Sequence, residues 1–177
     1  ILGPNGSGKT TTLGMILEVV APTSGSFEWF DGISNVEARQ KIGSILETPC
    51  FYGYLTAVQN LRIIAHIKKC PLDRINTILK QVNLYERRND KFKAYSLGMK
   101  QRLSLAAALL SDPPVLMLDE PTNGLDPQGI AEVRELIQNI AAQGKTIIMA
   151  SHLRRSTKSL YGLLCLTKGS ETSRGFC

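Results

Sequence analysis

The sequence lacks the long apolar run that a membrane-spanning helix requires, and it lacks the regions that make up a secretory signal peptide. It has few cysteines, and their spacing fits neither a metal site nor a secreted disulfide framework: Cys50, Cys70, Cys165 and Cys177. We therefore expect a reducing, cytosolic environment. The chain also lacks an initiator methionine and begins on "ILGPNG", in the middle of an expected element, so we expect a fragment of a longer domain.

The excess of positive charge is concentrated near one end of the chain. The formal net charge is +6 over 177 residues. Residues 153–177 carry five basic side chains and one acidic side chain, which leaves 16 basic and 14 acidic side chains in the other 152 residues. The main part of the chain is close to neutral, so its charge gives no argument for a nucleic-acid partner.

Strand and helix patterns alternate along the chain, which predicts an α/β fold with a mainly parallel sheet flanked by helices. Short apolar runs predict strands at residues 25–30, 42–46, 114–120 and 145–150. Capping residues and apolar periodicity predict helices from about Thr10, after Thr56, over residues 72–82, after Ser96, and from Pro127 to Gly144. The apolar face of the helix after Thr56 is expected to contain Val58, Leu61, Ile64 and Ala65.

A glycine-rich loop opens the chain. Residues 3–10, "GPNGSGKT", match the pattern G-x-x-x-x-G-K-[ST] in full. Glycines let backbone N–H groups turn toward phosphate oxygens, and the dipole of the following helix favours an anion there. Lys9 is expected to reach the β- and γ-phosphates, and the Thr10 hydroxyl to bind Mg²⁺. The predicted nucleotide-binding residues are Gly3, Pro4, Asn5, Gly6, Ser7, Gly8, Lys9, Thr10 and Thr11. A glycine-rich turn with an incidental lysine is the alternative.

An acidic pair follows the expected buried strand "VLML". Asp119 is expected to hold Mg²⁺ through water, opposite Thr10. Glu120 is expected to be the general base that orients and activates the attacking water. Such a pair is often only the solvated start of a loop, but its position after a complete phosphate-binding loop favours the catalytic interpretation. The two motifs together predict a nucleoside triphosphatase.

Residues 95–102, "YSLGMKQR", resemble the signature motif of ABC ATPases, which is usually Leu-Ser-Gly-Gly-Gln followed by Gln-Arg. Four positions match and three depart: Ser96, Gly98, Gln101 and Arg102 match, whereas Tyr95, Leu97 and Met99 do not. The resemblance implies a P-loop NTPase fold with a helical signature subdomain at about residues 51–100. It also implies that Ser96 and Gly98, at a helix N-terminus, face the γ-phosphate held by the other subunit. An ordinary capped helix is the alternative.

Further marks of the family follow at matching positions. "NGLD" with Asp126 resembles the D-loop, and "ASH" places His152 like the catalytic switch histidine that contacts the γ-phosphate. Where the family usually has glutamine, this chain has Glu47, which the resemblance places near Mg²⁺ as an indirect ligand. With a carboxylate at this position, the chain resembles the bacterial peptide-antibiotic and lantibiotic export or immunity branch of the family, and gliding-motility ATPases share similar features. A neutral substitution is the alternative. The resemblance implies an ATP-binding domain over residues 1–153, incomplete at its N-terminus.

The resemblance implies that ATP and Mg²⁺ are the cofactors and that ATP hydrolysis drives transport through a separate transmembrane permease subunit. It implies a homodimer or heterodimer of ATP-binding domains at the cytoplasmic face of the membrane, with no nucleic acid. Two alternatives remain open. One is a non-transport ABC ATPase of the DNA-repair or translation type, although the DNA type inserts a long coiled coil between its motifs and only 86 residues separate Lys9 from Ser96. The other is an inactive, truncated product.

Residues 154–177 do not continue the family pattern. The switch histidine is usually followed by leucine and a short acidic helix, whereas this chain continues "LRRSTKSLY". One allowed codon choice for Arg154 to Tyr161, read one base later, encodes Asp-Glu-Val-Gln-Lys-Val-Cys. We therefore interpret this tail as aberrant, through a frame slip just after His152; a genuine divergent extension is the alternative.

Overall fold

The computed structural model describes residues 1–46 and 50–151. The strands are β1 (Ile42–Ile45), β2 (Val115–Asp119) and β3 (Thr146–Ala150). The α-helices are α1 (Lys9–Ile16), α2 (Asn35–Gln40), α3 (Ala57–Lys68), α4 (Arg74–Gln81), α5 (Leu97–Leu109) and α6 (Pro127–Ala142). Three short 3₁₀ turns are η1 (Phe30–Gly32), η2 (Tyr85–Arg87) and η3 (Phe92–Ala94). In this part of the chain, every helix is too short or too polar to cross a membrane.

The strands form a parallel sheet in the order β1-β2-β3. The start of the chain extends this sheet beyond β3, because Leu2 forms a parallel bridge with Ser151. The Ser151 N–H donates to the Ile1 carbonyl at 2.9 Å. All five residues of β2 are buried, as expected for a central parallel strand that is covered on both faces. The predicted α/β fold is therefore confirmed.

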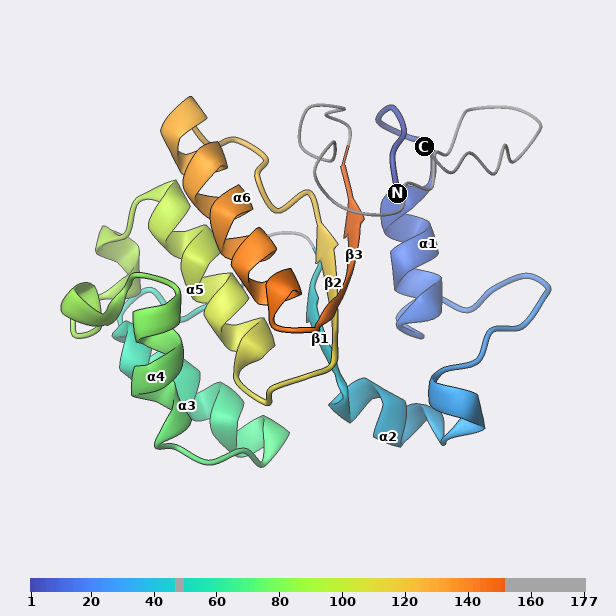
Figure 1. Cartoon of the computed structure of the whole chain (residues 1–177), viewed down its shortest axis with the longest axis horizontal. Helices are drawn as coiled ribbons and strands as arrows, with labels where there is room; N and C mark the ends of the chain where they lie inside the picture. The colour runs from blue at the N-terminus through green and yellow to red at the C-terminus, as the bar shows by residue number, and fades with distance from the viewer. Residues whose placement is uncertain (47–49, 152–177) are drawn as a thin grey trace.

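Helices cover both faces of the sheet (Figure 1). Leu116 and Leu118 of β2 pack into the large core formed with α3, α4, α5 and α6. Val115 and Met117 alternate with them and pack with α1 on the other face. Gly43 of β1 allows α5 to approach closely, because an added Cβ would lie 2.3 Å from the Ala108 carbonyl oxygen. The sheet thus fixes α1 and the end of β2 against each other.

Local capping signals correctly predicted several helix starts. The Thr56 hydroxyl accepts from the Gln59 N–H, and the Gln59 side chain accepts from the Thr56 N–H, which completes a capping box at α3. On the predicted apolar face of α3, Leu61 and Ala65 are buried, and Val58 and Ile64 pack against the same core. The expected helix at 72–82 is α4.

One expected strand is wrong. Residues 25–29 form no regular element, and η1 follows them. The alternation of Phe27 and Trp29 with polar residues is typical of a strand, but a strand also needs a neighbour for its backbone hydrogen bonds. Nowhere in the described ranges does a strand pair with this segment, and residues 25–28 are exposed.

Candidate nucleotide-binding site

The loop before α1 has the backbone of an anion-binding site. Gly6 and Gly8 have φ values of 78° and 85°, a region that residues with a Cβ rarely adopt. Gly8 is the N-cap of α1, and no side chain caps the helix at this position. The N–H groups of the first helical turn have no carbonyl partner within their own helix. The loop and the helix end therefore offer backbone donors to an anion, as the sequence predicts.

Lys9 lies inside this loop. Its side chain is only 6% exposed, and its ammonium donates to the Gly3 carbonyl at 3.0 Å and to the Pro4 carbonyl at 3.2 Å. The same Nζ lies 3.7 Å from Glu120 Oε1. A single ammonium therefore joins the phosphate-binding loop to the acidic residue that follows β2. The sequence predicts both residues but not this ion pair.

Thr10 and Asp119 form the second junction between the loop and β2. The Thr10 hydroxyl donates to Asp119 Oδ2 at 2.5 Å. Asp119 is buried, and its Oδ1 has no hydrogen-bond partner among the residues that the structure describes. A buried carboxylate oxygen without a partner is costly, and Mg²⁺ prefers oxygen ligands. The hydroxyl and the carboxylate therefore fit the magnesium site that the sequence predicts.

Glu120 has an unusual backbone conformation. Its φ is 45°, in the left-handed region that few residues other than glycine, asparagine and aspartate adopt. The Glu120 N–H donates to the Ala150 carbonyl at 3.0 Å, and the Glu120 carbonyl accepts from the Asn123 N–H at 3.0 Å. Strained residues that their surroundings hold in place are enriched at functional sites. The turn after β2 thus directs Glu120 toward Lys9.

The signature motif begins α5. The Ser96 hydroxyl accepts from the Met99 N–H at 3.3 Å, so Ser96 is the expected cap. A Cβ added to Gly98 would have Leu125 Cδ2 as its nearest neighbour, at 4.0 Å, so there is open space beside this glycine. Figure 1 shows that the N-terminus of α5 lies across the sheet from α1. Ser96 and Gly98 are therefore separate from the site around Lys9.

The segment that resembles the D-loop packs against the segment that resembles the signature motif. Asp126 caps α6, because its Oδ1 accepts from the Gly129 N–H at 3.0 Å. A Cβ added to Gly124 would lie 3.1 Å from Leu97 Cδ2, although Leu97 is 50% exposed. The sequence does not predict this contact. The one feature of the sequence that could have indicated it is the bulky leucine in the signature motif, Leu97.

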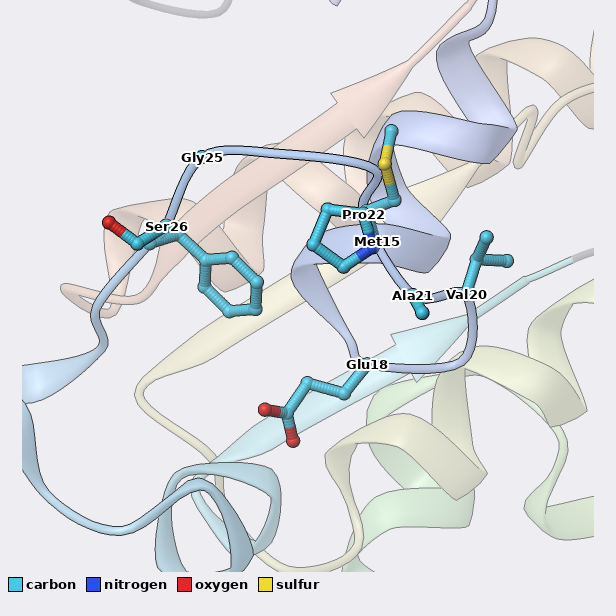
Figure 2. Close-up of a pocket in the computed structure, with 8 residues that line it drawn as sticks. Met15, Glu18, Val20, Ala21, Pro22, Gly25 and Ser26 are labelled. Carbon is cyan, nitrogen blue, oxygen red and sulfur yellow. The ribbon is translucent and has the colours of Figure 1, made fainter.

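Glu47, His152 and residues 154–177 lie outside the described residues. The structure does bring together Lys9, Thr10, Asp119 and Glu120. A separate pocket of about 370 Å³ lies at the other end of α1 (Figure 2). It is lined by Met15, Glu18, Val20, Ala21, Pro22, Gly25, Ser26 and Phe27, so it is distinct from the phosphate-binding loop.

Comparisons with known proteins identify the family of this chain. The family model described as ABC transporter matches residues 1–123. The chain is 46% identical over 167 residues to the bacitracin transport ATP-binding protein BcrA of Bacillus licheniformis, covering 90% of this chain and 54% of that protein. It is 39% identical over 160 residues to the lantibiotic transport ATP-binding protein SrtF of Streptococcus pyogenes, covering 90% of this chain and 70% of that protein. The chain spans about half the length of several relatives that it matches.

A solved structure shows the same fold. The ATP-binding cassette MJ0796, solved as a dimer in a post-hydrolysis state with ADP and Pi, matches with a TM-score of 0.82 at 28% identity. The match covers 99% of this chain and 84% of that chain. Because the family model covers residues 1–123 and SrtF is 39% identical with 70% of its length covered, this chain belongs to the ABC transporter family of ATP-binding proteins.

Proposed function

We propose that this chain binds ATP with Mg²⁺ and hydrolyses it, as one ATP-binding domain of a transporter. The observation that carries the proposal is the convergence of four side chains between α1 and β2. Lys9 lies 3.7 Å from Glu120, and the Thr10 hydroxyl lies 2.5 Å from Asp119, whose other oxygen is buried without a hydrogen-bond partner among the described residues. A cation, a metal-ligand pair and a base thus adjoin one anion-binding loop.

Each side chain has a distinct role in this proposal. The backbone N–H groups of residues 3–11 hold the phosphate oxygens. Lys9 exchanges the Gly3 and Pro4 carbonyls for the β- and γ-phosphates, which are stronger acceptors because they are charged. Thr10 and Asp119 would hold Mg²⁺, which would neutralise negative charge on the phosphates.

Glu120 is the general base. It takes a proton from the attacking water as the oxygen of that water forms a bond to the γ-phosphorus, and the bond from this phosphorus to the bridging oxygen breaks. ADP and phosphate are the products. The resemblance to the family assigns His152 to the γ-phosphate and Glu47 to the region of the metal and water; both assignments remain part of the proposal.

The complete site needs a second ATP-binding domain. Ser96 and Gly98 lie across the sheet from α1, and the space beside Gly98 is open, which supports a role at the nucleotide of a partner domain. Their backbone donors at the start of α5 suit a γ-phosphate. MJ0796, a dimeric relative, supports a dimer for this chain.

The substrate class follows from the relatives. Since BcrA and SrtF are described as bacitracin and lantibiotic transport proteins, we propose a peptide antibiotic as the transported substrate. The chain would drive a separate transmembrane permease from the cytoplasmic face of the membrane.

Phosphate release from ATP by the purified chain tests the enzymatic proposal. We expect release that requires Mg²⁺ and is lost on chelation and in Asp119→Asn, because both remove the metal site. Asp73→Asn is the matched control, since Asp73 is exposed and its side chain makes no capping hydrogen bond at α4. Release that persists without Mg²⁺ would contradict the metal assignment. A folded chain that binds ATP and releases no phosphate would favour the inactive product.

A further inference from the structure

The first residue of the segment that resembles the signature motif is a tyrosine, where the family usually has leucine. The Tyr95 side chain is only 4% exposed and belongs to the large hydrophobic core. Burial of a phenol without a hydrogen-bond partner is costly. Tyr95 has such a partner, because its hydroxyl donates to the Arg87 carbonyl at 2.7 Å. The usual leucine has no group that could make this bond, so the bond is specific to the tyrosine.

The carbonyl that accepts this hydrogen bond belongs to a segment fixed against the start of α3. The Arg88 carbonyl accepts from the Val58 N–H at 3.3 Å. The Phe92 N–H donates to the Leu55 carbonyl at 2.8 Å. These two hydrogen bonds anchor the segment to α3, whose inner side packs into the core, so the acceptor of the Tyr95 hydroxyl is fixed.

Tyr95 is attached through both its backbone and its side chain. Its N–H donates to the Phe92 carbonyl at 3.0 Å, and its ring centroid lies 6.1 Å from that of Phe92. Its hydroxyl reaches back along the chain to the Arg87 carbonyl. Burial, together with the nearby Asp90 carboxylate, raises the pKa of this hydroxyl above its ordinary value of 10.0, so it stays protonated and donates at neutral pH.

Ser96 follows Tyr95 directly and depends on it for its position. Ser96 is exposed, and its hydroxyl accepts from the Met99 N–H at 3.3 Å, near the long end of the range for a hydrogen bond. The next buried residue along the chain is Leu103, in the middle of α5. Between these two buried residues lie Ser96, Gly98 and the N–H groups of the first helical turn, which have no carbonyl partner within the helix. Tyr95 is thus the buried residue that sets where α5 begins.

We propose that Tyr95 is a positioning residue for ATP hydrolysis, because its hydrogen bond to the Arg87 carbonyl holds Ser96 where it meets the γ-phosphate of a partner domain. This role deepens the proposed function and rests on the assignment of Ser96 and Gly98 to the nucleotide of that partner. Donors that are already in place stabilise the charge that develops on the phosphates, since no reorganisation is needed. A small displacement of such groups costs a large factor in rate. Tyr95 is buried and acts through Ser96 rather than on the nucleotide itself.

Tyr95→Phe tests the role of the hydroxyl alone. The variant keeps the buried ring, and the Arg87 carbonyl keeps a donor, the Asp90 N–H at 3.0 Å, so we expect it to fold. Loss of one buried hydrogen bond corresponds to about five-fold in an equilibrium constant. A dimer of two such chains loses two of them, so ATP-dependent dimerisation, followed by light scattering, should weaken by about 25-fold. We expect kcat to fall by at least about five-fold, while the affinity of the monomer for ATP stays within about two-fold.

Two further variants are the controls. Ser104→Ala removes a buried hydroxyl from the same helix, since Ser104 is 3% exposed and donates to the Lys100 carbonyl at 2.9 Å. This bond lies inside α5, away from its N-terminus, so dimerisation and kcat should stay within about two-fold of the parent chain. Tyr95→Leu restores the residue usual in the family and should resemble Tyr95→Phe, because neither contains the hydroxyl. A kcat equal to that of the parent chain in either Tyr95 variant would overturn the proposal.

Amide hydrogen exchange measures the position of Ser96 without ATP. The Met99 N–H, which donates to the Ser96 hydroxyl, should exchange about five-fold faster in Tyr95→Phe, relative to the amides of β2, which report global unfolding. Ser104→Ala should leave this ratio unchanged. Unchanged exchange in Tyr95→Phe, or faster exchange with unchanged dimerisation, would also overturn the proposal.

Failure of the proposed function gives a different pattern of results. A folded parent chain that neither dimerises nor hydrolyses ATP would contradict the proposed function, and the role of Tyr95 with it. A parent chain that does both, with a Tyr95→Phe variant that matches it in every measurement, would contradict the role of Tyr95 alone.

Discussion

Replacing Glu120 by glutamine should separate nucleotide binding from hydrolysis. Glu120 Oε1 lies 3.7 Å from Lys9 Nζ, and the two side chains are 21% and 6% exposed. At an effective dielectric constant of about 20, Coulomb's law gives about 4 kcal/mol of attraction at this separation. Desolvation of both groups opposes most of that attraction, so we expect a net contribution of about 1 kcal/mol.

The variant should therefore bind ATP somewhat more tightly while it hydrolyses ATP far more slowly. Without the carboxylate, Lys9 is released toward the phosphates, and about 1 kcal/mol corresponds to about five-fold tighter binding. A general base contributes about 10²- to 10⁴-fold to a rate, so the hydrolysis rate should fall by a factor in that range. The phosphate-binding loop itself is unchanged by the substitution.

Calorimetric titration with ATP gives the affinity, and single-turnover release of phosphate gives the rate. Glu135→Gln is the matched control, since Glu135 lies on the exposed side of α6. A normal hydrolysis rate in Glu120→Gln would show that another group is the base. Loss of ATP binding would show that Glu120 supports the phosphate-binding loop instead.

Three further substitutions probe the signature motif and the fold. Gly98→Asp should abolish ATP-dependent dimerisation in light scattering, because it places a charged side chain in the open space beside residue 98, where the partner's γ-phosphate would lie. ATP binding by the monomer should persist, and its loss would argue against a role in trans. Leu97→Ala should remove the contact with Gly124 and lower kcat more than the affinity for ATP; an unchanged kcat would exclude a positioning role. The hydrogen bond from Lys145 at 2.7 Å holds the pKa of Asp112 below its usual 3.8, so its stabilisation is present at neutral pH and is lost as the pH falls through the folded-state pKa. Asp112→Asn should therefore cost up to about 1 kcal/mol in thermal unfolding at pH 7 and less in strong acid, and a loss independent of pH would contradict the ion pair.

The side chains around Lys9 could be predicted from the sequence because each depends on a local signal. The glycine spacing fixes the phosphate-binding loop, and the buried run of β2 ends at Asp119. Thr56 and Ser96 mark helix starts through hydrogen bonds to residues three positions later. These signals need no knowledge of the rest of the fold.

Contacts between distant segments could not be predicted in this way. The pairing of Lys9 with Glu120 depends on how α1 packs on the sheet, and the contact of Leu97 with Gly124 depends on how α5 meets the turn before α6. The expected strand at residues 25–30 failed for a related reason, since alternating apolar residues do not supply a pairing partner.

Titration of the purified chain with Mg²⁺ and ATP, beside its Lys9→Ala variant, measures whether the loop around Lys9 binds ATP. Lys9 is buried in the loop and would make charge-assisted hydrogen bonds to phosphate, so its loss should weaken binding by about 100-fold or more. Lys41→Ala is the control, because Lys41 is an exposed lysine at the end of α2. We expect saturable binding of one ATP per chain that Lys41→Ala keeps and Lys9→Ala loses. Equal affinity in all three proteins, or no binding by the folded parent chain, would contradict a nucleotide site at this loop.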